Sequence, residues 1–327
     1  MQWFKKFIFT FLVVVLIAAP IPESGAAEEI YPSKPINLIV PFPPGGGSDL
    51  VSRLIADKFV EFLGQPIISV HKPGGGGSLA ASFAAKAKPD GYTILFAGTS
   101  PILINPVLKK TDYKIEDFIP LGMVGDNPNR LSVKKDSRWK TLRDFVEEAK
   151  KSPAKLMVAS YGKFSFSHLV LEQLSQLANI QVTHVPFKGA AEAMTNLLGG
   201  HVDAAMTSGV AGMTDSPSIR VLAMNTDQRV EQHAQIPTFK ELGYPISPSG
   251  GYSFYIQKDA PKAVFEKLSD AQKKAFERYP GEIKVNLLKF ELIPEIPPCS
   301  SQEAFRRLIQ ARDEIIKTAR ERGLFEK

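Results

Sequence analysis

Four loops of this sequence combine glycine with small hydroxyl side chains, and each follows an apolar run and opens an amphipathic segment. They cover residues 43–49, 74–78, 160–167 and 187–190. The first turn of a helix leaves backbone N–H groups unpaired, and the helix dipole favours negative charge there. Glycine permits close backbone approach, and serine adds donors. The loops therefore predict a site for a small carboxylate, although 74–78 is the one most easily explained as a structural turn.

Motifs for other chemistry are absent or incomplete. Two of the loops begin like a dinucleotide fingerprint, but a leucine occupies the place of the third glycine in each, and no Gly-Lys-Ser/Thr follows. No Gly-x-Ser-x-Gly elbow occurs, and none of the five histidines lies three or four residues from another. Ser167 and His168 are adjacent, so on a helix they point in different directions; we interpret His168 as an early-helix packing residue. The sequence thus predicts no catalytic residue, no metal site and no cofactor.

The net charge indicates the kind of ligand, and the N-terminal segment indicates the cellular location of the protein. The 327 residues carry a formal net charge of +6 without a dense Lys/Arg stripe, which suits small anions and argues against nucleic acid. Lys5 and Lys6 precede an apolar run over 7–19, and small residues occupy 24–27. This run is shorter than the roughly 20 residues that a membrane anchor needs. We therefore predict a signal peptide over residues 1–27, cleaved near Ala26 or Ala27, and a periplasmic chain without a membrane span.

Short apolar runs alternate with amphipathic segments, which is typical of βαβ units and a mostly parallel sheet. We expect strands over residues 36–40, 67–70, 92–96, 131–133, 156–159, 182–185, 204–206, 219–223 and 252–256. Expected helices begin near residues 50, 78, 141, 169, 190, 262 and 302. The predicted fold class is α/β.

Two Pro/Gly/Asn-rich stretches divide the chain. Residues 127–129 and 245–251 interrupt the alternation and predict two crossings between domains. Lobe one is then 28–127 plus 251–327, and lobe two is 128–250. We expect a monomer.

Several motifs together resemble the Bug-type solute receptors of tripartite tricarboxylate transporters. The matching stretches are residues 40–49, 71–77, 89–92, 160–169, 184–189, 199–203 and 236–243, and they cover nearly all of the chain after the signal peptide. The resemblance implies a two-lobed periplasmic-binding-protein fold of type II, with a ligand gripped in the cleft between the lobes and delivered to membrane permease subunits.

By position, the resemblance also implies which residues contact the ligand. They are Phe42, Pro44, Gly45, Gly46, Ser48, Thr99 and Ser100 from lobe one, and Ser160, Gly162, Ser165, Phe187, Gly189 and Asp203 from lobe two. Asp203 has an equal alternative as a cap or hinge residue. The third loop departs from the family pattern because Lys163 and Phe164 replace small residues. We expect Phe164 to form a pocket wall and Lys163 to pair with a second acidic group, the alternative being a solvated lysine and a plug at the lobe edge.

Three functions remain open at this point. The leading hypothesis is a binding protein for a small carboxylate with no chemistry of its own. A ligand sensor for a membrane signalling protein would use the same cleft. An exported hydrolase would need a nucleophile with a base in reach, and the sequence offers none that is convincing. The identity of the carboxylate and of the permease does not follow from the residues.

Overall fold

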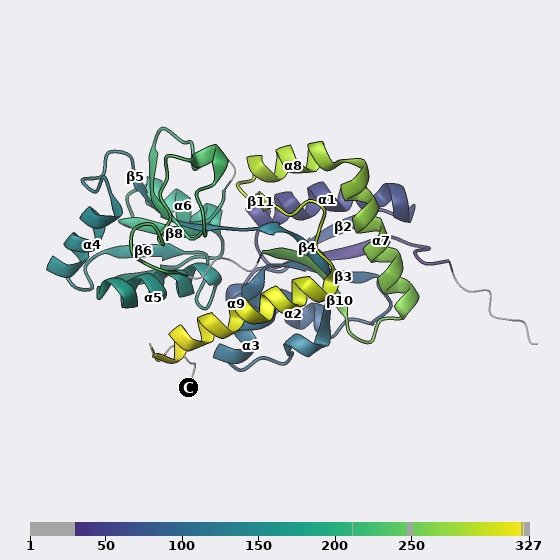
Figure 1. Ribbon diagram of the computed structural model, residues 1–327. Helices are drawn as coiled ribbons and strands as arrows, with labels where there is room; N and C mark the ends of the chain where they lie inside the picture. The colour runs from purple at the N-terminus through teal and green to yellow at the C-terminus, as the bar shows by residue number, and fades with distance from the viewer. Residues whose placement is uncertain (1–29, 211, 247–250, 322, 324–327) are drawn as a thin grey trace, which may run out of the picture.

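Two separate β-sheets organise the chain in the computed structural model (Figure 1). The structure describes residues 30–210, 212–246, 251–321 and 323. We call the elements packed on the six-stranded sheet lobe one and those on the five-stranded sheet lobe two. The predicted signal peptide lies outside the described residues, as do residues 247–250 of the second predicted crossing.

The sheet of lobe one has the order β11-β4-β10-β3-β1-β2. Its strands are β1 (Ile36–Val40), β2 (Ile67–His71), β3 (Thr93–Ala97), β4 (Phe118–Asp126), β10 (Tyr252–Gln257) and β11 (Ile293–Pro294). Side chains alternate between the two faces. Ile36, Leu38 and Val40 enter one core and Ile39 enters the other, so helices must cover both faces.

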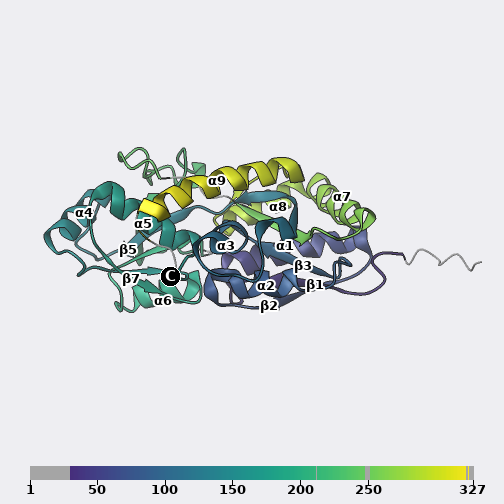
Figure 2. The ribbon, with the colours of Figure 1, turned by 90° about the horizontal axis from the view of Figure 1, so that it is seen from below.

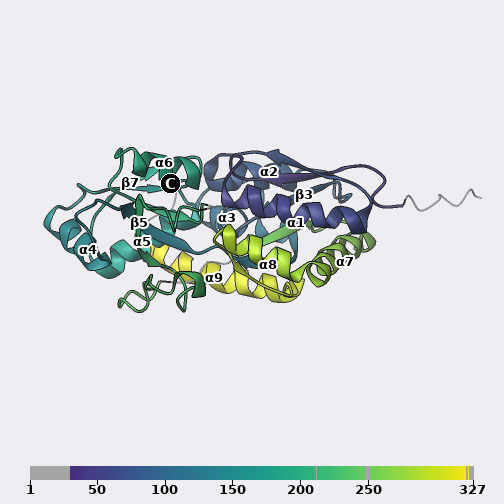
Figure 3. The same ribbon diagram turned by 90° about the horizontal axis from the view of Figure 1, so that it is seen from above.

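Helices cover each face of this sheet. Figure 3 shows α1 (Gly47–Leu63), α7 (Lys262–Arg278) and α8 (Pro280–Lys289) on one side. Figure 2 shows α2 (Ser78–Ala85), α3 (Asn105–Leu108) and α9 (Ser301–Glu321) on the other. Short helical turns in lobe one are η1 (Gly75–Gly77), η2 (Ser100–Ile104) and η3 (Ile115–Asp117), while η4 (Glu231–His233) follows the last strand of lobe two.

Lobe two repeats this plan with the strand order β7-β6-β8-β5-β9. Its strands are β5 (Asn129–Lys134), β6 (Met157–Ser160), β7 (Thr183–Pro186), β8 (Ala204–Ser208) and β9 (Ile219–Met224). Its helices are α4 (Leu142–Lys151), α5 (Phe166–Ala178) and α6 (Ala190–Leu198). The α/β class with two helix-flanked lobes is confirmed.

Both sheets are mixed, although the sequence pattern predicted mostly parallel ones. The expected parallel pairs are present between β1 and its neighbours β2 and β3, and between β6 and its neighbours β7 and β8. However, β10 runs antiparallel to β3 and β4, and β5 runs antiparallel to β8 and β9. Both β5 and β10 come directly after a segment that leads over from the other sheet, so they are inserted against the direction of the βαβ units.

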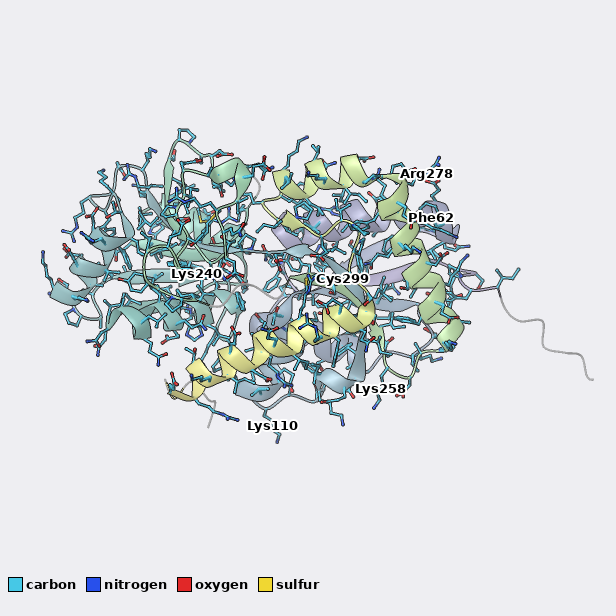
Figure 4. All side chains as sticks on the ribbon, in the orientation of Figure 1. Phe62, Lys110, Lys240, Lys258, Arg278 and Cys299 are labelled. Carbon is cyan, nitrogen blue, oxygen red and sulfur yellow. The ribbon has the colours of Figure 1, made fainter. Side chains whose placement is uncertain are left out.

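The last helix, α9, connects the two lobes. It packs on β4 in lobe one and reaches α5 in lobe two, as Figures 1 and 2 show. Gln173 of α5 donates to Thr318 at 3.3 Å, and Gln176 donates to Glu321 at 2.5 Å. The only cysteine of the chain, Cys299, lies just before α9 with a free thiol (Figure 4). Within the described residues, no helix is both long and apolar enough to span a bilayer.

The packing of β10 gives a direct test of the lobe-one core. The Phe254 ring is fully buried, with ring centroids 5.1 Å from Phe59 and 4.7 Å from Phe96. We expect Phe254→Ala to lower the free energy of unfolding by about 3–5 kcal/mol because it leaves a cavity. Val285→Ala, at an exposed position of α8, should change it by less than about 0.5 kcal/mol. Urea titration followed by circular dichroism measures both, and equal small losses would contradict this core assignment.

Candidate functional site

A small chamber lies where the two lobes meet. Its lining comes from both of them: Phe42, Gly46, Gly47, Ser48, Gly98, Thr99, Ser100, Pro101, Asn127, Tyr161, Phe166, Ala190, Ser208, Gly251 and Tyr252. None of these side chains carries a formal charge. We call this space of about 40 Å³ the inner chamber.

Helix N-termini from both lobes face the inner chamber. The lining includes the first residues of α1 and α6 and, in Phe166, the first residue of α5. The first intrahelical bonds of α1 come from the Asp49 and Leu50 amides to Gly46 O, so the Gly47 and Ser48 amides have no partner within the helix. Amides and dipoles that converge on an uncharged space favour an anionic guest, and the Ser48, Thr99 and Ser100 hydroxyls add donors.

A second cavity of about 410 Å³ lies beside the first, and we call it the outer chamber. It is lined by Phe42, Gly74, Gly75, Gly76, Lys109, Tyr161, Gly162, Lys163, Phe164, Pro186, Phe187, Lys188 and Glu192. Phe42 of lobe one and Tyr161 of lobe two line both chambers. Their rings meet edge to face with centroids 5.6 Å apart, so the aromatic pair forms a shared wall that crosses the lobe interface.

Asp49 holds the first loop in place. Its carboxylate is fully buried, accepts the Gly45 amide at 2.8 Å and lies 2.7 Å from His71 Nε2 at the end of β2. It also pairs with Arg53 one turn along α1. Burial alone would raise the pKa of Asp49, but these hydrogen bonds and the Arg53 charge hold it below its usual value. Asp49 therefore stays ionised and orients the loop that offers the Gly47 and Ser48 amides.

The second and third loops touch across the cleft. Gly76 has φ +63°, and a Cβ there would lie 2.7 Å from Lys163 O, so only glycine fits this approach. The buried Asn105 side chain, at the start of α3, donates to Gly76 O at 3.0 Å and so holds the second loop in place. The second loop thus lines the outer chamber as well as forming a turn.

A pair of stacked histidines supports the third loop. The rings of His168 and His184 are 3.9 Å apart and nearly parallel. His168 Nδ1 accepts the Phe164 amide at 3.2 Å, and Phe164 has φ +60°, a backbone conformation uncommon for a bulky residue. His184 Nε2 lies 2.6 Å from Ser160 Oγ. The histidines therefore act as packing residues that set the shape of loop 160–167.

The contact between Ser160 and His184 has the distance of a catalytic pair but not its environment. Ser160 is fully buried, and its hydroxyl also accepts the Gly162 amide at 3.2 Å. Burial, reinforced by the stacked His168, lowers the pKa of His184 to about 3. A base with such a low pKa is poorly matched to proton abstraction at neutral pH. Among the described residues, no group of three or more His, Cys, Asp or Glu is arranged to hold a metal ion.

Most of the predicted ligand contacts line the inner chamber or the outer chamber, or lie in the same loops without lining either. The inner chamber takes Phe42, Gly46, Ser48, Thr99 and Ser100, and the outer chamber takes Phe42 again with Gly162, Lys163, Phe164 and Phe187. Pro44, Gly45, Ser160, Ser165 and Gly189 lie in the same loops without lining either chamber. Ser165 caps α5 by accepting the His168 amide, and Gly189 precedes α6.

Asp203 is the one predicted contact that lies elsewhere. It comes just before β8, and its carboxylate accepts the Met157 amide at 2.8 Å, at the start of β6. This is the amino end of two parallel strands, the edge opposite to the chambers. This hydrogen bond at the start of β6 is consistent with a cap, the role that the sequence offered as an alternative to a ligand contact.

Several lining residues were not singled out from the sequence. Ser208 ends β8, at the carboxyl edge of parallel strands where ligands bind in open α/β sheets, so its position was a usable signal. Asn127 lies in the first expected crossing and Tyr252 directly follows the second, and Asn127 donates to the Tyr252 hydroxyl at 2.9 Å. Tyr161 belongs to the third loop but was not named as a contact.

Two helix-flanked lobes with a chamber lined from both of them are the architecture of two-lobed solute-binding proteins. A family model described as "Tripartite tricarboxylate transporter family receptor" matches residues 51–320. The chain belongs to this family of periplasmic receptors, and it is a binding protein and not an enzyme.

Individual relatives agree with this assignment. The chain is 32% identical over 278 residues to a "UPF0065 protein in gbd 5'region" of Cupriavidus necator, with 84% of each chain covered. It is 32% identical over 240 residues to the protein BugT of Bordetella pertussis, with 72% of each covered. The resemblance to Bug-type receptors is thereby confirmed.

Solved structures share the fold over nearly the whole chain. The periplasmic binding protein BugD superposes with a TM-score of 0.82 at 25% identity, covering 91% of this chain and 100% of that one. An R. palustris protein with adipate gives a TM-score of 0.82 at 26% identity, covering 90% and 98%. The two-lobed fold of periplasmic binding proteins is therefore confirmed.

The depressed pKa of His184 makes a prediction about stability and pH. Below pH 6.5 the unfolded chain binds a proton at His184 that the folded protein refuses until about pH 3. The contribution of His184 to the free energy of unfolding is therefore fully present above pH 6.5, and it is lost as the pH falls from 6.5 toward 3. We expect His184→Gln to remove about 1–3 kcal/mol of the fall in unfolding free energy between pH 7 and 4.

Urea titrations at several pH values measure this slope. His201→Gln, at an exposed histidine of the same lobe, is the matched control. If both variants keep the wild-type slope, His184 is not the group responsible.

Proposed function

We propose that this chain is an exported receptor that closes around a small carboxylate and delivers it to the membrane permease of a tripartite tricarboxylate-type transporter. The observation that carries the proposal is the inner chamber, which lacks charged side chains and receives helix N-termini from both lobes. Such amides can replace the hydration of one carboxylate without a counter-ion. The relative that was solved with adipate supports a carboxylate ligand.

The proposal includes the location and the parts of the molecule. Residues 1–27 would be removed on export to the periplasm. Residues 28–127 with 251–327 would move as one lobe against 128–250, with hinges at the two crossings. The separate sheets and the passage from β4 to β5 near Asn127 support this division.

The ligand-binding residues in this proposal belong to both chambers. A carboxylate would meet Gly46, Ser48, Thr99 and Ser100 in the inner chamber. Phe164 and Phe187 would form apolar walls of the outer chamber, near Gly162. Lys163 is exposed, and its ammonium lies 5.0 Å from the centre of the Phe164 ring, so it is available to a second acidic group on the ligand.

Thermal denaturation with mono-, di- and tricarboxylates and amino acids tests the proposed function. A ligand that binds only the folded protein stabilises it by about 2.7 kcal/mol at 100 times its dissociation constant. Gly46→Val should abolish the shift and keep the fold, because Gly46 has φ −78° and a Cβ there meets only ordinary contact. Its side chain would occupy the space in front of the α1 amides.

The variant also separates the possible outcomes. A carboxylate that stabilises wild type and Gly46→Val equally would show that the first loop does not bind it. If no carboxylate stabilises the wild type, the proposed ligand class is wrong.

A second prediction concerns Lys163 and the length of the ligand. A charge-assisted hydrogen bond contributes about 1.5–3 kcal/mol, and exposure of Lys163 favours the low end. We expect Lys163→Ala to weaken a dicarboxylate about 10-fold and its monocarboxylate analogue hardly at all. Calorimetry with the matched ligand pair measures the difference, and Lys155→Ala, an exposed lysine of the same lobe, is the control. Equal losses for both ligands would exclude the charge pair.

A further inference from the structure

A buried ion pair joins the two lobes beside the inner chamber. Arg130 lies on β5 of lobe two, and Glu291 follows α8 of lobe one. Their side chains are only 4% and 6% exposed, and Arg130 Nη1 contacts Glu291 Oε2. The two lobes are therefore joined by an ion pair that is almost fully shielded from water.

Thr214 completes the pair from lobe two. Its amide donates to Glu291 Oε1 at 2.9 Å, and its hydroxyl donates to Glu291 Oε2. Arg130 Nη1 also reaches the Thr214 hydroxyl oxygen. The Glu291 carboxylate of lobe one is thus held by both a strand residue and a loop residue of lobe two.

The backbone around Glu291 fits this interpretation. Glu291 has φ +62°, a left-handed conformation that is unfavourable for glutamate, so its contacts must hold it there. A Cβ on Gly209 would lie 2.6 Å from Glu291 Cβ, which leaves room only for glycine. Lobe two therefore approaches the end of α8 as closely as backbone atoms permit.

Gly209 of lobe two also touches the first loop, residues 43–49, of lobe one. A Cβ on Gly47 would lie 3.0 Å from Gly209 O, and Ser208, the preceding residue, lines the inner chamber. Gly209 thus lies against both Glu291 and the first loop. The position of lobe two against α1 and its position against Glu291 cannot change independently.

A buried ion pair contributes little net stability, because both charges lose their hydration, but removing one partner leaves the other unpaired. When the lobes separate, water can reach both groups again. The pair is therefore better suited to fixing one relative position of the lobes than to stabilising either lobe alone.

We propose that Arg130, Glu291 and Thr214 form an interlobe latch that holds the closed conformation and so prolongs ligand residence. These are positioning residues, since none of them lines the inner chamber. The inference rests on the closure proposed above. Because the latch needs no ligand atom, it also favours the closed conformation in the ligand-free protein.

Small-angle scattering of the ligand-free mature chain tests the latch without knowledge of the ligand. We expect Glu291→Gln to increase the radius of gyration relative to wild type. Glu295→Gln is the matched control, because Glu295 pairs with Arg307 within lobe one at 3.1 Å and should leave scattering unchanged. Equal radii for wild type and Glu291→Gln, or a loss of stability without widening, would overturn the proposal.

Binding kinetics with adipate as the probe give a second readout. We expect Glu291→Gln to raise the dissociation rate about 10-fold or more with little change in association, as for other buried charge pairs. Adipate that binds neither wild type nor variant would count against the proposed ligand class, while scattering still decides the latch. Should Glu291→Gln fail to fold, Thr214→Val keeps both charges and removes one hydroxyl, and it should widen the protein in the same direction.

Discussion

Unpaired amides at helix N-termini, aimed at a space without charged side chains, are the interaction on which the rest of the structure depends. An anion leaving water must recover its hydrogen bonds, and fixed backbone donors provide them without a counter-ion that would itself need burial. This requirement explains why the loops follow strands and begin helices. It also explains Asp49, whose buried carboxylate is satisfied by Gly45 and His71 and therefore orients the α1 amides without entering the chamber.

The floor of the inner chamber coincides with the passage between the lobes. Asn127, just after β4, donates to the Tyr252 hydroxyl at the start of β10, and both residues line the chamber. A rotation of one lobe about this region would separate the loops of the two lobes far more than it would separate Asn127 from Tyr252. The donors of α1 and α6 belong to different lobes, so a complete set exists only when the lobes are together.

Much of this arrangement could be predicted from the sequence, and the exceptions have physical reasons. The alternation of apolar runs located β1 and β6, and glycine with serine marked the loops. Strand β4 was not predicted, because Pro120, Gly122 and Gly125 interrupt its apolar pattern. The strand still forms between two antiparallel neighbours, where shifts in register accommodate these residues. Helix α8 was missed because Pro280 reads as a stop although it is favourable in the first turn. Asp203 was ambiguous because a cap and a ligand contact require the same carboxylate, and only the edge of the sheet at which it lies distinguishes them.

The two chambers divide recognition between backbone and side chains. Backbone amides cannot be changed by substitution, so the α1 and α6 amides of the inner chamber stay available even where the Ser48, Thr99 or Ser100 hydroxyl is replaced. The outer chamber is lined by glycines and by larger side chains, among them Lys163 and Phe164. The amide of Phe164 is held by His168, which keeps a bulky residue at φ +60° while its ring stays buried. The stacked histidines therefore hold the third loop through its backbone and through Ser160, so the side chains of its outer wall can differ without loss of this support.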